Sequence, residues 1–163
     1  MSKAANAKDV QAELAQLARD AKSAQDLMER MVKLLHQRML KYNWVGFYML
    51  EPQEAGQPPI LVLGAFQGAM TPHTRIPLHQ GICGAAASTG TTFIVDDVSL
   101  DPRYLACSLE TKSEMVVPVF AHGKVVGELD IDSHFPAAFK NEDRAMVEHC
   151  ASLVGASLEK SSQ

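Results

Sequence analysis

The chain has 163 residues, 47% of them hydrophobic, and a formal net charge of −4 with acidic and basic residues interspersed. This length supports one domain with a sizeable core and leaves little room for two. The charge gives no electrostatic reason to expect nucleic acid, and no stretch approaches the roughly 18 apolar residues of a membrane span. Three cysteines without a CxxC pair, and a start without the apolar core of a signal peptide, indicate the reducing cytoplasm. We therefore expect a globular cytoplasmic protein whose partner is a small molecule.

The first forty residues are predicted to be helical, because apolar residues recur at helical spacing from Val10 to Leu40. Ser23 and Asp26 form a capping pair at an internal break, so this region is one long helix or two. Its apolar positions exceed what a small sheet needs for cover, and a surplus apolar helix face is typical of an interface. We therefore expect a homodimer that forms through the N-terminal region.

Five strands are predicted from short apolar runs that are rich in β-branched and aromatic residues and bounded by Pro, Gly and polar loops. They are residues 44–50, 60–66, 91–95, 113–120 and 124–132. The first two form a hairpin, and the last two form a second hairpin across a turn that contains Gly123. A short helix is expected in GICGAAASTG, whose small residues suit close packing on backbone, and an amphipathic helix over residues 139–160.

The order of these elements predicts an α+β fold with an antiparallel sheet of about five to six strands, flanked by N- and C-terminal helices on one face. One connection stands out. Residues 96–112, DDVSLDPRYLACSLETK, form a stretch longer than most structureless loops, and such loops in compact domains often carry function. This loop contains Cys107.

Several motifs together resemble the free methionine-(R)-sulfoxide reductase family of GAF-domain proteins. They are NWVGFYML, RIP followed by GICG, AC followed by SEMVVPV, GELDIDS and the final amphipathic helix. The resemblance covers about residues 25–160 and implies a single GAF domain over residues 23–163, after a helical extension over residues 1–22. The GAF fold alone is weak functional evidence, because most such domains only bind small ligands. The specific indication of this family is the position of Cys107 seven residues before the glutamate of SE, together with the two aspartates of DID.

The resemblance implies thiol-dependent reduction of free L-methionine (R)-sulfoxide through a cysteine sulfenic acid, with thioredoxin or a small thiol as the reductant and no cofactor. Such chemistry needs an attacking thiolate, a proton donor for the departing oxygen, and a second thiol that releases the sulfenic acid as a disulfide. By resemblance Cys107 attacks, while Glu114 and Asp132 face the sulfoxide oxygen. Cys83 is the candidate for the second thiol.

The resemblance also implies a substrate-binding set: Asp130 helps to hold the amino acid, and Trp44 with Tyr48 forms an aromatic wall against the S-methyl group. Trp44 and Tyr48, four apart on one strand, share a face of the sheet. Asp130 and Asp132, two apart, also share a face, while Leu129 and Ile131 point to the other. Clustered carboxylates raise one another's pKa, so one of them can stay protonated and act as the proton donor.

Each candidate also has a purely structural interpretation. A cysteine in a soluble protein is often a small buried hydrophobe, so Cys107 and Cys83 can be packing residues, and Cys150 on the last helix is expected in the core. The aspartates of LDIDS can form a turn at the end of a strand, and Trp44 can fill the core. No metal site is expected, because the six histidines are scattered and only the adjacent His149 and Cys150 bring two ligand types together.

Three positions depart from the family pattern. His73 occupies the place of the usual resolving cysteine, two residues ahead of the arginine of RIP, while Tyr104 replaces a histidine and Ser108 an aspartate. Without that cysteine the sulfenic acid still forms, but the fast route back is lost. Two functions therefore stay open: the reductase, and a GAF module that binds or senses an amino acid without reducing it. The retained acids and Cys107 favour the reductase, as does the lack of an output segment, whereas His73 favours the module.

Overall fold

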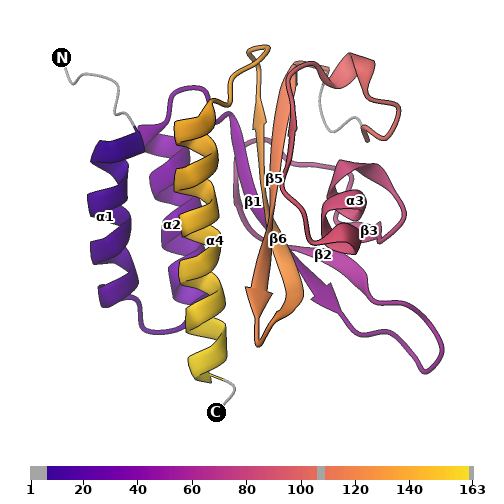
Figure 1. Cartoon of the computed structure of the whole chain (residues 1–163), viewed down its shortest axis with the longest axis horizontal. Coiled ribbons are helices and arrows are strands. Elements are labelled where there is room, and N and C mark those ends of the chain that lie inside the picture. The colour runs from indigo at the N-terminus through magenta and orange to yellow at the C-terminus, as the bar shows by residue number, and fades with distance from the viewer. Residues whose placement is uncertain (1–6, 106–108, 162–163) are drawn as a thin grey trace.

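The protein is described by a computed structural model that covers residues 7–105 and 109–161. Its centre is a six-stranded antiparallel sheet in the order β3 (Arg75–Pro77), β2 (Ile60–Gln67), β1 (Trp44–Glu51), β6 (Lys124–Ser133), β5 (Ser113–Ala121) and β4 (Phe93–Val95). The N- and C-terminal helices α1 (Ala7–Asp20), α2 (Ala24–Arg38) and α4 (Asn141–Ser161) lie together on one face of this sheet, and the short helix α3 (Gly81–Thr89) lies on the opposite face (Figure 1). Within the described ranges, no helix is both long enough and apolar enough to cross a membrane. The predicted α+β class is confirmed, whereas α3 adds a layer on the second face that the sequence did not indicate.

The N-terminal region forms two helices, α1 (Ala7–Asp20) and α2 (Ala24–Arg38). The break between them lies at the position that the capping pair Ser23 and Asp26 predicted. The Ser23 hydroxyl accepts a hydrogen bond from the backbone N–H of Asp26 at 3.0 Å, which satisfies a donor that the first helical turn leaves unpaired. Val10 and Leu14 of α1 are fully buried, and α1 packs against α2 and α4. The apolar surplus that suggested a homodimer is thus covered by the chain itself. The division predicted at residue 22 remains a prediction.

Both predicted hairpins are confirmed. They pair β1 (Trp44–Glu51) with β2 (Ile60–Gln67), and β5 (Ser113–Ala121) with β6 (Lys124–Ser133). The two hairpins join through β1 and β6 at the middle of the sheet. The predicted strand at residues 91–95 is the edge strand β4 (Phe93–Val95).

One strand was missed. The edge strand β3 (Arg75–Pro77) pairs with β2, although the sequence suggested only a connection there. Three residues that end in proline show no alternation, and proline is tolerated because an edge strand leaves one side without a ladder partner. The long connection before β5 also contains a 3₁₀ turn at Val98–Leu100.

The two remaining helices are α3 (Gly81–Thr89) and α4 (Asn141–Ser161). Helix α3 lies very close to the connection before it, since a side chain at Gly84 would come within 2.8 Å of the Leu78 carbonyl oxygen. This agrees with the packing role expected of its small residues. Cys150 of α4 is fully buried in the core, as predicted.

Successive side chains of each strand point to opposite faces of the sheet, so the interior is divided into two cores. Leu129 and Ile131 of β6 pack in the core between the sheet and helices α1, α2 and α4. Trp44 and Tyr48 of β1 pack instead in the smaller core under α3, together with Cys83. These three predicted site residues therefore belong to the α3 side of the sheet.

Candidate active site

The α3 side of the sheet carries carboxyl groups on adjacent strands. Asp132 of β6 lies opposite Trp44 of β1 and opposite Glu114 of β5 in the strand register. Asp130, two residues earlier on β6, lies opposite Gly46 and Val116. Directly opposite residues have their Cβ atoms only about 4.5–5.5 Å apart, so the register brings the three predicted acids together. All three are buried, with at most 5% of any of them exposed.

A fourth carboxyl group, which sequence reasoning passed over, belongs to the same row. Glu128 lies opposite Tyr48 in the register and is completely buried. Neither of its carboxylate oxygens meets a hydrogen-bond partner of normal geometry within the described residues. The signal that could have found it is the same two-residue spacing that linked Asp130 and Asp132, because residue 128 is the next position on that face.

The aromatic wall is present and larger than predicted. The Trp44 ring stacks on Tyr48 with centroids 6.1 Å apart, and on Phe66 of β2 at 5.7 Å. Gly46 makes room for it, since a side chain there would lie 2.3 Å from the Trp44 ring. Trp44 Nε1 donates to the Ala69 carbonyl at 3.0 Å, which holds the ring in place.

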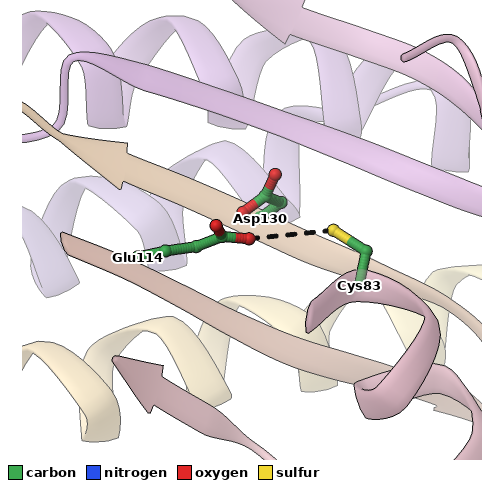
Figure 2. Close-up of side chains that lie close together, drawn as sticks. All are labelled: Cys83, Glu114 and Asp130. Carbon is green, nitrogen blue, oxygen red and sulfur yellow. Dashed lines mark hydrogen bonds between the residues drawn. The ribbon is translucent and has the colours of Figure 1, made fainter. Parts of the chain in front are cut away.

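Helix α3 places Cys83 directly over the acids. Its thiol donates to Glu114 Oε1 at a sulfur–oxygen distance of 3.9 Å, and Asp130 lies beside the pair (Figure 2). One ligand atom from each of these three residues lies within 4.8 Å of the other two. Burial raises the pKa of the Cys83 thiol well above its usual range, and the charges of Asp130, Glu128 and Glu114 raise it further. Cys83 is therefore held as the neutral thiol, which is the weaker nucleophile.

Burial also raises the pKa of all four carboxyl groups. It raises the pKa of Glu114 well above the usual range, with Asp132 adding to the rise, whereas a hydrogen bond with Asp130 lowers it. Burial is also the largest cause of the raised pKa of Asp130, followed by the charges of Glu114 and Glu128. Burial and then Asp130 raise the pKa of Asp132. These directions agree with a cluster in which a carboxyl group keeps its proton near neutral pH.

Two cavities flank the cluster. The first has a volume of about 10 Å³ and is lined by Cys83, Glu114, Asp130 and Tyr48 among others. The second has a volume of about 110 Å³ and includes Trp44 and Asp132 in its lining. The larger grooves along α4 contain none of the predicted site residues. Each of the two small cavities therefore combines a carboxyl group of the cluster with a ring of the aromatic wall.

The predicted nucleophile Cys107 and its neighbour Ser108 lie outside the described residues. The chain that leads to them does reach the site, because Leu105 lines the smaller cavity together with Cys83. His73, which the sequence resemblance places where a resolving cysteine was expected, lines the same cavity. Its carbonyl oxygen accepts a hydrogen bond from the Tyr48 hydroxyl at 2.6 Å.

The fold and this buried acidic site agree with the comparisons to known proteins. The sequence model of the GAF domain matches residues 23–158, so the chain belongs to the GAF-domain family. Within that family it is similar to proteins named free methionine-R-sulfoxide reductase. The relative from Saccharomyces cerevisiae is 41% identical over 71% of this chain and 62% of its own, and the relative from Escherichia coli is 37% identical over 68% and 62%. The aligned part thus spans slightly under two thirds of these relatives.

Solved structures extend the similarity over nearly the whole fold. The free methionine-R-sulfoxide reductase of Neisseria meningitidis, solved in complex with its substrate, is 31% identical with a TM-score of 0.86, over 100% of this chain and 95% of that one. The type II enzyme of Thermoplasma acidophilum is 38% identical with a TM-score of 0.77, over 88% and 96%. The resemblance predicted from the sequence motifs is confirmed.

Proposed function

We propose that the protein reduces free L-methionine (R)-sulfoxide to methionine with electrons from thiols. The observation that carries the proposal is the arrangement of Glu114, Asp130 and Asp132 beside the Trp44–Tyr48 wall under α3. Similarity to reductases at 37–41% identity supports the same activity. An ammonium group suits buried carboxyl groups that form no ion pair with the described residues, and a methylated sulfur suits an aromatic face.

The substrate is proposed to extend across both small cavities. Asp130 holds the ammonium end, and Trp44 with Tyr48 contacts the S-methyl group. Glu114 and Asp132, which face each other across β5 and β6, then lie on either side of the sulfoxide oxygen. The ammonium group stabilises the ionised form of the carboxyl group that it touches, and the other acids stay protonated.

The chemical step is assigned to Cys107. Its thiolate attacks the sulfoxide sulfur, and the oxygen leaves that sulfur for the cysteine sulfur, which becomes a sulfenic acid while methionine is released. The sulfoxide is reduced by two electrons and Cys107 is oxidised by two. Glu114, with its raised pKa, is the proposed donor of the proton that the departing oxygen needs.

The return to the thiol has two possible routes. In the first, Cys83 attacks the sulfenic acid, forms a Cys83–Cys107 disulfide with loss of water, and thioredoxin or a small thiol reduces the disulfide. In the second, a small thiol attacks the sulfenic acid with loss of water, and a second small thiol reduces the resulting mixed disulfide to free Cys107. The burial and raised pKa of Cys83 slow its attack, which favours the second route.

Mass spectrometry after exposure to methionine sulfoxide without reductant separates the two routes. A mass lower by two hydrogens indicates the disulfide, and Cys83→Ser then stops at the sulfenic acid. A mass higher by one oxygen in the wild-type protein indicates the second route. In that case His73→Cys, which restores a thiol at the family's position, gains thioredoxin-dependent turnover.

Activity itself is tested with racemic methionine sulfoxide and a small thiol, by chiral separation of the sulfoxide that remains. We expect selective loss of the R form. Cys107→Ser is expected to abolish methionine formation and to leave the thermal unfolding midpoint unchanged, because a hydroxyl group is a far weaker nucleophile than a thiolate. Full activity of this variant would overturn the assignment of Cys107.

One observation favours a second candidate function. His73 stands in place of the resolving cysteine, so the site can be a binding or sensing module that holds an amino acid and does not reduce it. Calorimetry then detects binding of methionine or its sulfoxide, while the protein's mass stays unchanged after prolonged exposure to the sulfoxide. Formation of methionine removes this candidate.

We further propose that the protein acts in the cytoplasm as a homodimer. The described cysteines, Cys83 and Cys150, are free thiols, as a reducing compartment requires. The dimer has less support than the sequence suggested, because the apolar residues of α1 and α2 are buried within the chain. Sedimentation that shows a monomer at micromolar concentration would remove the dimer.

A further inference from the structure

We propose that Cys83, Glu114 and Asp130 form a binding site for a thiophilic divalent cation such as Zn²⁺, and that the bound ion blocks the substrate site. The three residues come from α3, β5 and β6, and each is at least nine-tenths buried. Their side chains converge on one point, as Figure 2 shows.

The distances between the ligand atoms fit one ion. Zinc binds sulfur at about 2.3 Å and carboxylate oxygen at about 2.0–2.2 Å, so tetrahedral ligation separates a sulfur and an oxygen ligand by about 3.5–3.7 Å. Cys83 Sγ and Glu114 Oε1 are 3.9 Å apart, and an oxygen of Asp130 is within 4.8 Å of both. Side-chain shifts of a few tenths of an ångström to about an ångström therefore close this set around an ion.

A second and independent observation points to a cation at this place. Both carboxylate oxygens of Glu128 and one of Asp130 are buried without a hydrogen-bond partner in the described parts of the chain. Glu128 lies two residues before Asp130 on the same face of β6, and its carboxyl group adjoins the Cys83 thiol. Buried carboxyl groups are normally paired or bound to metal, so these oxygens are available to a positive ion.

The size and chemistry of the cavity narrow the class of ligand. The cavity between Cys83, Glu114 and Asp130 has a volume of about 10 Å³, which is close to the roughly 10–15 Å³ that a single water molecule needs. One ion fits there, whereas an amino acid requires the site to expand. A thiolate beside carboxylates selects zinc or cadmium over magnesium and calcium, which prefer oxygen ligands alone.

A bound cation favours the ionised forms of the thiol and carboxyl groups in the cluster. In its absence, burial raises the pKa of the thiol and of the carboxyl groups, which favours their neutral forms. A divalent cation replaces the protons on its ligands, so binding releases protons and strengthens with rising pH. Because Glu114 and Asp130 are also assigned to the substrate, the ion and methionine sulfoxide exclude each other. This consequence for activity rests on the proposed function, whereas cation binding does not.

Binding is tested by titration with Cd²⁺, whose thiolate complexes absorb in the ultraviolet. The protein used carries Cys107→Ser and Cys150→Ala, so Cys83 is its single thiol. We expect one equivalent of Cd²⁺ to produce the thiolate absorption and to release protons into a weakly buffered solution. Zn²⁺ is expected to displace Cd²⁺, and Mg²⁺ is not.

Matched variants of this single-thiol protein locate the ligands. Glu114→Gln and Asp130→Asn each remove one ligand and are expected to weaken binding by more than the about 10–100-fold typical of residues that only support a ligand. Glu128→Gln is expected within that range, and Glu142→Gln on the exposed start of α4 is expected to change nothing. Circular dichroism confirms that each variant is folded. No thiolate absorption up to millimolar Cd²⁺, or equal affinity in Glu114→Gln and Glu142→Gln, would overturn the site.

Inhibition is tested with the wild-type protein in the methionine sulfoxide assay. We expect Zn²⁺ to raise KM at least tenfold with little change in kcat, and a chelator to restore the original KM. Inhibition that substrate cannot overcome would overturn the overlap of the two sites. If the protein has no reductase activity, the Cd²⁺ titration still decides whether the cation binds.

Discussion

The two faces of the sheet bury different kinds of side chain. The face under α1, α2 and α4 contains aliphatic, aromatic and methionine side chains, among them Leu129, Ile131 and Met115. The face under α3 contains four carboxyl groups and a thiol, and several of their oxygens have no partner in the described structure. Hydrophobic burial stabilises the first face, whereas burial of unpaired polar groups destabilises the second. The helical face thus supports the fold, and the α3 face holds the candidate active site.

The sharpest test of this difference is Glu114→Gln on the α3 face. The substitution keeps the shape but removes the acidic proton, so we expect reductase activity to fall by about 10²–10⁴-fold. The free energy of unfolding should not fall, because the amide has no charge to bury. Kinetics and thermal unfolding measure the two quantities, with Glu142→Gln as the control. An unchanged rate would move the acid role to Asp132.

The matching test on the helical face is Leu129→Ala. The side chain is fully buried, so its loss should lower the free energy of unfolding by about 2–5 kcal/mol through lost burial and a residual cavity. Below the unfolding transition, the rate per folded molecule should stay near that of the wild type. Asp130→Asn, the neighbour that points to the other face, should lose substrate binding instead. Equal destabilisation by the two substitutions in urea unfolding would contradict the division into two faces.

Glu128→Gln tests the burial of the fourth carboxyl group through pH. Burial raises the pKa of Glu128 in the folded protein, so the folded state keeps its proton at pH values where the unfolded chain has lost it. Stability from this group is present at low pH and falls as pH rises through the folded pKa.

The glutamine variant cannot ionise and should lack this decline. Between pH 4 and pH 8, we expect the free energy of unfolding of the glutamine variant to rise relative to that of the wild type by on the order of 1–3 kcal/mol. Denaturant unfolding with a chelator present measures this difference. Parallel pH profiles of the two proteins would show that ionisation of the buried Glu128 carboxyl group does not destabilise the folded state.

The smallest expected effect concerns the helical layer far from the site. Ser23→Ala removes the cap of α2 and should lower the free energy of unfolding by about 1 kcal/mol, with no change in KM or kcat. Ser23→Asp keeps an oxygen that accepts from the first turn and should retain most of the stability. A loss of activity in the alanine variant would show that the helical layer communicates with the site.

Much of the division of the sheet into an apolar face and an acidic face was predictable from residue spacing. The two-residue period of LDID correctly separated Leu129 and Ile131 from Asp130 and Asp132, because successive side chains of a strand point to opposite faces. The capping pair at Ser23 and Asp26 correctly marked the break between the first two helices. Both signals depend on the geometry of a single element, which the order of residues dictates directly.

The arrangement of the site depended on contacts between elements. Sequence spacing did not bring Cys83, Glu114 and Asp130 together; they meet because α3 packs over the point where β5 pairs with β6. The lack of a hydrogen-bond partner of normal geometry for the Glu128 carboxylate among the described residues likewise depends on everything that packs around it. The sequence by itself determined the elements, their buried faces and the resemblance to a family, because these follow from local periodicity and motifs. Only the tertiary structure decided which acids share a cavity and what lies above them, since a distance between side chains of different elements depends on strand register and helix packing.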